Sequence, residues 1–142
     1  MVDSLDLKII DALVENSKVS YVQLGNTIGL SPSSVRERIK KMEDEQIIKK
    51  YGVILDHSKL GYGLEVFIML KLYSGKLDQF SKEWNNLSEI KELYRVTGNY
   101  NIFLKAIVVD QIHLQKFIDK LIIYGEPTTH LILSDLGNSN PG

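Results

Sequence analysis

Two short amphipathic helical patterns are separated by a turn of only three residues, Gly29-Leu30-Ser31, which limits how the chain can fold. Leu24 and Ile28 recur at helical spacing before the turn, and Gly29 favours a helix end because glycine adopts left-handed backbone angles. Ser31 is a good N-cap for the next helix, and Pro32 suits its first position. So short a connection makes the two helices cross sharply, and Gly25 leaves room for their close approach. The pattern predicts a helix-turn-helix.

The sequence predicts a small helical domain around this turn. Apolar residues recur at helical spacing from Leu5 to Val14, after Asp3 and Ser4 as cap candidates. Residues 47–54 are typical of a short strand or wing, and residues 56–63 are rich in turn formers. We therefore expect a winged helix-turn-helix domain over residues 1–50 and a wing and linker over 51–63. A second domain is expected over 64–136, followed by a flexible tail over 137–142.

The pattern of the second domain alternates between strands and helices in the order βαββαβ. We expect strands at residues 64–73, 90–97, 102–109 and 128–133. One helix follows the first strand, and Asp110 caps another after the third. This order is ferredoxin-like, with both helices on one face of an antiparallel sheet, so the whole chain is predicted to be α+β. Apolar residues on the second face (Phe67, Met69, Phe103, Ile107) predict that another sheet covers it, as in a homodimer.

Composition excludes several classes of function. With 142 residues, of which 44% are apolar, the chain suits one domain or two small ones. The absence of cysteine excludes disulfides and thiolate sites, and His57, His113 and His130 show no metal-ligand spacing. No nucleophile, base and oxyanion donors assemble in any motif, so no catalytic residue, cofactor or metal is expected. The N-terminus lacks the cations of a signal peptide, and no apolar run reaches the roughly 20 residues that span a bilayer. We expect a cytoplasmic protein without membrane association.

A local cationic face stands out against a net charge of only -1. At about 100° per residue, the third helix places hydroxyl and charged side chains opposite the stripe of Val35, Ile39 and Met42. Hydroxyls at a helix N-terminus suit a helix that enters a major groove, since serine bonds bases or phosphates. We expect base contact from Arg36, backbone contact from Lys40 and Lys41, and an extension of the basic surface by Lys49 and Lys50. The predicted DNA-binding residues are Ser31, Ser33, Ser34, Arg36, Glu37, Lys40, Lys41, Lys49 and Lys50.

Two alternatives remain for these charges. Charge runs are often merely solvated helix faces, although the turn, the cap and the preceding helix favour DNA contact here. Arg38 lies beside the apolar stripe, where it can contact DNA or pair with an acid such as Glu43 or Asp11.

The sequence resembles the Lrp/AsnC family of prokaryotic transcription regulators, the feast/famine regulators. The resemblance covers nearly the whole chain and rests on the order and spacing of short segments. These are residues 5–13, 28–31, 35–43, 47–49, 59–62 and 96–102. It implies a winged helix-turn-helix, a ferredoxin-like sensor domain of the RAM type that dimerises and binds small effectors, and higher oligomers such as octamers.

The resemblance also implies an effector site. Family effectors are usually amino acids that bind between dimers, near the loop after the second sensor strand and near the last strand. On this chain the corresponding residues are Gly98, Asn99, Tyr100, Asn101, Thr129 and His130. Family members commonly have aspartate at the positions of Asn99 and Asn101. Asparagine offers an ammonium group an oxygen without charge assistance, which predicts weaker effector binding. The same residues also suit a plain hairpin turn.

Three functions are compatible with these observations. The first is a sequence-specific, dimeric DNA-binding regulator that responds to an amino acid. The second is an architectural DNA-binding protein without an effector, which the two asparagines favour and the modest charge disfavours. The third is an enzyme or small-molecule-binding module whose helices serve only as a dimer arm, which the missing catalytic constellation disfavours.

Overall fold

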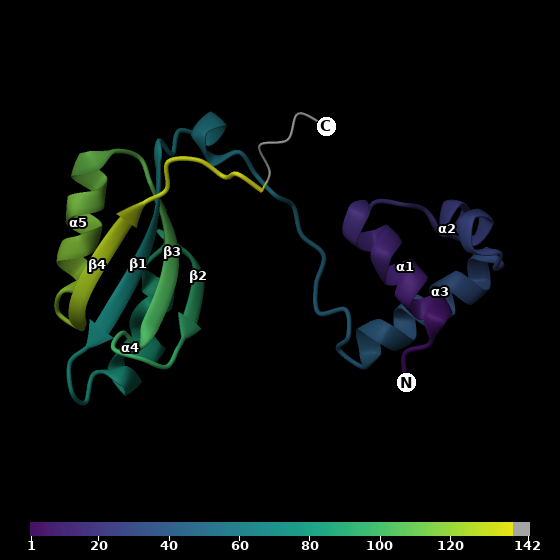
Figure 1. The fold of residues 1–142 in the computed structure, drawn as a ribbon, viewed down its shortest axis with the longest axis horizontal. Helices are drawn as coiled ribbons and strands as arrows, with labels where there is room; N and C mark the ends of the chain where they lie inside the picture. Colours follow the sequence, from purple (N-terminus) through teal and green to yellow (C-terminus); the bar gives the residue numbers. More distant parts are fainter. Residues whose placement is uncertain (138–142) are drawn as a thin grey trace. The chain divides into compact units, whose positions relative to one another are not determined.

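A computed structural model describes residues 1–137 of the chain, which form two compact units. The first unit is Met1–Ile54 and the second begins at Leu55, inside the predicted linker (Figure 1). Of the predicted tail, Gly137 is described, and its backbone N–H donates to Asp135 Oδ1 at 3.0 Å. The expectation for residues 138–142 lies outside the described residues.

The first unit consists of three helices, α1 (Ser4–Glu15), α2 (Tyr21–Ile28) and α3 (Pro32–Asp44). Their caps follow the sequence closely, with Asp3, Ser20 and Ser31 each accepting a backbone N–H of the first turn. A shared core joins the three helices, as expected for apolar stripes that need one another for burial. Its fully buried members are Ile9, Leu24, Val35, Ile39 and Met42.

The strand predicted over residues 47–54 is wrong, because this segment has no regular secondary structure. A strand needs a neighbour for its backbone hydrogen bonds, and all strands among the described residues lie between Leu64 and Leu131. The N–H groups of Ile47 and Ile48 donate to the carbonyl of Met42, at 2.8 and 3.1 Å. The segment therefore leaves α3 through a tight turn and continues as irregular backbone. A short 3-10 helix, η1 (His57–Leu60), follows in the second unit.

The second unit has the predicted βαββαβ order. Its strands are β1 (Leu64–Leu72), β2 (Ile90–Arg95), β3 (Ile102–Val108) and β4 (Gly125–Leu131). The helices are α4 (Leu77–Glu83), continued by the 3-10 turn η2 (Trp84–Asn86), and α5 (Gln111–Leu121). The sheet order is β2-β3-β1-β4, and every neighbouring pair is antiparallel. This is the ferredoxin-like arrangement that the sequence predicted.

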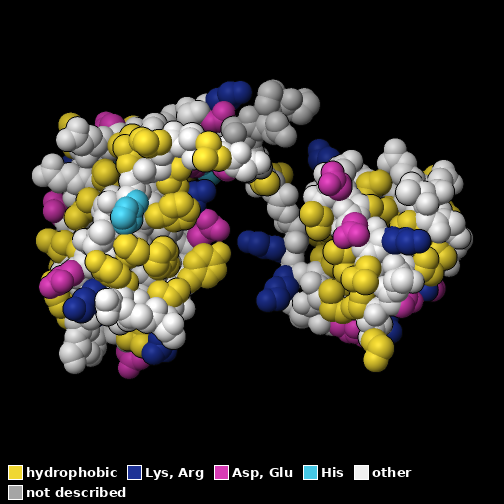
Figure 2. All heavy atoms as spheres, viewed as in Figure 1, with side chains coloured by type: hydrophobic (Ala, Val, Ile, Leu, Met, Phe, Trp, Pro, Cys, Tyr) yellow, Lys and Arg dark blue, Asp and Glu magenta, His cyan; other side chains and the backbone are white. Residues whose placement is uncertain are grey.

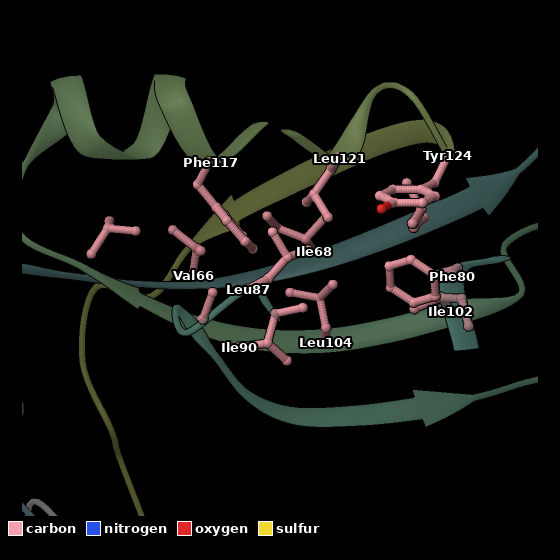
Figure 3. Close-up of a cluster of buried hydrophobic side chains, with 13 residues drawn as sticks. Val66, Ile68, Phe80, Leu87, Ile90, Ile102, Leu104, Phe117, Leu121 and Tyr124 are labelled. Atoms are coloured by element: carbon pink, nitrogen blue, oxygen red, sulfur yellow. The ribbon is translucent and has the colours of Figure 1, made fainter. Parts of the chain in front are cut away.

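One face of the sheet forms the core of the second unit. Alternate residues of β1 and β3, such as Val66, Ile68 and Leu104, are buried against Phe80 of α4 and Phe117 of α5 (Figure 3). Because the two helices bury the same set of strand residues, they lie on the same side of the sheet. Val66, Ile68 and Leu70 of β1, with the partly buried Leu72, thus share the helix-covered face.

The opposite face is apolar and partly open. Phe67 and Phe103 are 42% and 38% exposed, and hydrophobic side chains gather over the strands of this unit in Figure 2. Ile107 departs from the prediction of an open face, since it is only 2% exposed although it alternates with the buried Ala106 and Val108. Its register partner Glu65 accepts a hydrogen bond from His57 of η1, with 2.9 Å between Glu65 Oε1 and His57 Nδ1. Tyr94 of β2 pairs with Phe103 and is also exposed, so the open part of the face centres on Phe67, Phe103 and Tyr94.

Several strand boundaries differ from the prediction: β1 and β3 each end one residue early, β4 ends at Leu131, and two larger differences have a physical reason. β4 begins three residues earlier than expected, at Gly125, and includes Pro127. It is an edge strand, where proline is tolerated because its missing N–H need not face a neighbour. β2 ends at Arg95 rather than at residue 97, because the N–H of Val96 donates to the carbonyl of Asn101 and closes the loop.

Candidate nucleic-acid interface and effector loop

The turn between α2 and α3 is as tight as the sequence predicted. Gly29 ends α2 with a φ of 84°, and the N–H groups of Gly29 and Leu30 both donate to the carbonyl of Gly25. A Cβ atom on Gly25 would lie 2.3 Å from the carbonyl oxygen of Leu30. Glycine at position 25 is therefore what allows the turn to pack directly on α2 and to fix where α3 begins.

A cluster of hydroxyl groups occupies the N-terminus of α3. Ser31 Oγ accepts the backbone N–H of Ser34 at 3.2 Å and donates to Ser34 Oγ at 3.0 Å. Ser33 Oγ lies 3.2 Å from the same Ser31 oxygen. Ser31 and Ser33 are exposed, and Ser34 is half-buried. The cluster presents hydrogen-bonding groups at the positive end of the helix dipole, which is a favourable place for a phosphate.

The exposed face of α3 carries the predicted charged residues. Arg36, Glu37, Lys40 and Lys41 are all exposed, whereas Val35, Ile39 and Met42 on the other side are at most 3% exposed. Lys41 lies 4.0 Å from Glu45, an exposed ion pair that water screens. Lys49 and Lys50 are exposed too, but they lie in the irregular segment after α3. The structure thus brings the serines, Arg36, Glu37, Lys40 and Lys41 together on one helix.

Arg38 does not belong to this exposed face. Its Nη1 donates to Asp3 Oδ2 at 2.7 Å and to Asp6 Oδ1 at 3.0 Å. The structural alternative for Arg38 is therefore confirmed, with Asp3 and Asp6 in place of Glu43 or Asp11. The hydrogen bond from Arg38 lowers the pKa of Asp3 from its ordinary 3.8 to about 2, and the bond from the Asp6 backbone adds to this effect.

The predicted effector loop, residues 98–101, joins β2 to β3. Asn101 fastens it to the sheet: its Oδ1 accepts the N–H of Leu72 at 2.9 Å, and its own N–H donates to the carbonyl of Leu70 at 3.2 Å. Gly98 has a φ of 113°, a conformation that favours glycine, and is exposed together with Asn99. Of the two asparagines, Asn101 is thus a structural part of the loop, and Asn99 faces solvent.

The loop meets β4 through Tyr100. Thr128 Oγ1 donates to Tyr100 Oη at 3.2 Å, and both side chains are half-buried. Thr128 pairs with Met69, and His130 pairs with Phe67, so both lie on the open face of the sheet. Thr129 pairs with Ile68 and lies on the helix-covered side. Among the predicted effector residues, Thr129 and His130 are therefore on opposite faces. Thr128 was not among the predicted residues, although it is the β4 residue that bonds to the loop, and the two-residue period along the strand places it on the same face as His130.

Two histidines have hydrogen-bonding roles within the fold. His57 bonds to Glu65, and His113 Nδ1 accepts the N–H of Val109 at 3.0 Å. Among residues 1–137, no three His, Cys, Asp or Glu side chains gather in a way that could hold a metal ion. Within the same residues, no helix is long and apolar enough to cross a membrane.

Comparison with known proteins matches each unit to a family. Residues 2–43 match the AsnC-type helix-turn-helix domain, and residues 65–139 match the Lrp/AsnC ligand binding domain. The HTH-type transcriptional regulator FL11 of Pyrococcus furiosus is 31% identical over 134 residues, which cover 94% of this chain and 89% of that protein.

Solved structures agree with the sequence comparison. The structure of LrpC from Bacillus subtilis has a TM-score of 0.90 and 32% identity, covering 96% of this chain and 97% of its own. A transcriptional regulator from Neisseria meningitidis, solved as an L-Met complex, has a TM-score of 0.89 at 23% identity and covers 96% of this chain and 92% of its own. These matches confirm the resemblance and, with it, the prediction of a non-enzymatic transcription regulator. The chain belongs to the Lrp/AsnC family of DNA-binding transcriptional regulators.

Proposed function

We propose that this regulator recognises specific DNA sequences through α3, and that its DNA binding responds to an amino acid. The observation that carries the proposal is the face of α3 that begins with the hydroxyl cluster and continues through Arg36 and Lys40, opposite the buried stripe. This face is formed by a single helix, and the major groove of DNA is wide enough to admit one α-helix. The protein acts in the cytoplasm, where prokaryotic DNA lies.

The residues of this face take different roles. Arg36 contacts a base edge, and its guanidinium can donate two hydrogen bonds to guanine. Glu37 can accept a hydrogen bond from the amino group of a cytosine. Lys40 and Lys41 neutralise phosphates, as do Lys49 and Lys50 from the segment after α3. The serines bond to phosphates or bases at the helix N-terminus.

The protein acts as a homodimer or a larger homo-oligomer such as an octamer. The support is the apolar face of the sheet, on which Phe67, Phe103 and Tyr94 are 42%, 38% and 58% exposed. A second copy that pairs with this face removes these side chains from water. Two copies also present two α3 helices to two half-sites on DNA.

The effector is an amino acid that binds near residues 98–101 and β4, between dimers. The L-Met complex of the Neisseria meningitidis regulator supports this class of ligand. The loop beside this site contains Gly98, Asn99 and Tyr100. On the neighbouring strand β4, Thr128 and His130 lie on the same face of the sheet, and Thr129 lies on the opposite face. Asn101 contributes by holding the loop, and one lone pair of its oxygen is already used by Leu72.

The hydrogen bond from Leu72 to Asn101 Oδ1 also supports a second candidate function. With the Asn101 oxygen engaged and no charge at position 99, the loop attracts an ammonium group weakly. An architectural DNA-binding protein without an effector is the corresponding alternative.

The test is a titration of the purified protein against DNA from upstream of its own gene and against random DNA. It is run at fixed salt, with and without each amino acid, and light scattering on the same samples gives the oligomer size. We expect tighter binding to the upstream DNA, a shift with at least one amino acid, and particles of two chains or more. Specific binding that no amino acid changes would favour the effector-free alternative. Equal binding to both DNAs would refute the proposed recognition, and single chains in the light-scattering data would refute the proposed assembly.

A further inference from the structure

The capping box of α1 and Arg38 of α3 form one closed hydrogen-bonded unit. In the box, Asp3 Oδ1 accepts the N–H of Asp6 at 2.9 Å, and Asp6 Oδ2 accepts the N–H of Asp3 at 3.0 Å. Each carboxylate then has one oxygen left, and Arg38 Nη1 binds both of these oxygens. All four carboxylate oxygens are thus engaged, two with the α1 backbone and two with α3.

The unit joins segments that are far apart in sequence, since Arg38 is 35 residues from Asp3 and 32 from Asp6. Asp6 is only 8% exposed, whereas a carboxylate normally stays in water unless it is paired. Arg38 lies one residue before Ile39 in the buried stripe, on the edge of α3 that faces the start of α1. The contact therefore fixes α3 against α1 beside the face proposed to bind DNA.

The surroundings of Arg38 connect it to that face. A hollow of about 410 Å³ is lined by Asp3, Asp6 and Arg38 together with Ser34, Glu37 and Lys41 of α3. The unit thus shares a surface depression with residues proposed to meet DNA. Two carboxylates so close to a phosphate backbone would repel it if they were unpaired, and Arg38 balances part of their charge.

We propose that Arg38 is a positioning residue, which holds α3 in its DNA-binding orientation by locking it to the Asp3 and Asp6 capping box and does not itself contact DNA. This inference rests on the proposed recognition of DNA by α3. It predicts an unusual sign for one substitution, because a loss of negative charge near a DNA-binding face ordinarily strengthens binding by reducing repulsion. Here the loss of the Asp3 charge weakens binding, since it releases Arg38 and the start of α1.

The experiment compares Asp3→Asn, Arg38→Gln and the double variant with the parent protein on upstream and random DNA over a range of salt. Circular dichroism at the assay temperature establishes that each variant is folded. We expect each single variant to lower the preference for upstream over random DNA by about tenfold, a usual size for one coupled pair. A purely structural loss of folded protein would lower both affinities alike and leave the preference unchanged. The double variant should be no worse than Arg38→Gln, because both changes break the same unit.

The salt dependence separates positioning from contact. A cation that neutralises a phosphate contributes about 0.9 to the slope of log affinity against log salt. We expect the slope of Arg38→Gln to equal that of the parent protein. Asp11→Asn, which removes an exposed acid elsewhere on α1, is the matched control and should leave the preference unchanged.

Two results would overturn the inference. One is a lower salt slope for Arg38→Gln together with unchanged or tighter binding by Asp3→Asn, which would make Arg38 a DNA contact. The other is an unchanged preference in both variants. If the parent protein itself shows no preference for upstream DNA, the proposed sequence recognition is refuted. The positioning role of Arg38, which depends on that recognition, is then refuted as well.

Discussion

Neighbouring cations on α3 differ in what surrounds them. Arg36 and Lys40 are exposed, whereas Arg38 binds two carboxylates. The helical period predicts that Arg38 lies at the edge of the apolar stripe, and hence that it can pair with an acid. The identity of that acid depends on how α1 packs on α3, which no local pattern contains, and Asp3 and Asp6 take the place expected for Glu43 or Asp11.

The lowered pKa of Asp3 makes the first unit sensitive to acid. A carboxyl group whose pKa is lower in the folded state stabilises that state above its unfolded pKa, and the stabilisation is lost as pH falls toward the folded value. For Asp3 this window runs from its ordinary 3.8 down to about 2. We expect the free energy of unfolding to fall across this window more steeply in the parent protein than in Asp3→Asn. Urea unfolding followed by circular dichroism at several pH values measures both curves, and parallel curves would contradict this origin of the shift.

At the scale of the elements, capped helices were predicted more accurately than strands. The caps Asp3, Ser31 and Asp110 are local signals, and each is confirmed by a hydrogen bond from the first turn. Strand ends depend on partners: β2 stops where the Val96 to Asn101 bond closes the loop, and residues 47–54 remain irregular without a neighbouring strand. The predicted effector residues follow from the family resemblance, and the strand register places Thr129 and His130 on opposite faces of the sheet.

The α2–α3 turn gives a prediction at this scale. Gly25→Ala would place a methyl carbon 2.3 Å from the Leu30 carbonyl oxygen, which is backbone and cannot move without displacing α3. Overpacking of this kind costs roughly 1–3 kcal/mol of unfolding free energy, and we expect weaker DNA binding with it. Gly52→Ala is the matched control, because a Cβ there meets nothing within 4 Å. Equal stability of the two variants in urea unfolding would show that the turn tolerates a side chain.

At the scale of the whole molecule, the change along the sequence between helical spacing and strand-like alternation of apolar residues predicted both domains and the order βαββαβ. The sheet order β2-β3-β1-β4 and the common side of α4 and α5 follow from that order. The sequence could not predict that Ile107 is buried, because its burial depends on tertiary packing outside the alternating pattern. Nor could it predict that Asn101 binds β1, since Leu72 is 29 residues away. Family models match both units, the helix-turn-helix over residues 2–43 and the ligand-binding domain over residues 65–139. How α3 recognises DNA is then the property that decides the function.

The most direct test of that question compares Arg36→Ala with Lys40→Ala on upstream and random DNA across a range of salt. We expect Arg36→Ala to reduce the preference for upstream DNA by about tenfold, because a base contact is lost. Lys40→Ala should weaken binding to both DNAs alike and lower the salt slope by about 1, because a phosphate contact is lost. If Arg36→Ala loses equal affinity for both DNAs, Arg36 does not read a base, and if neither variant changes binding, the exposed face of α3 is a solvated surface.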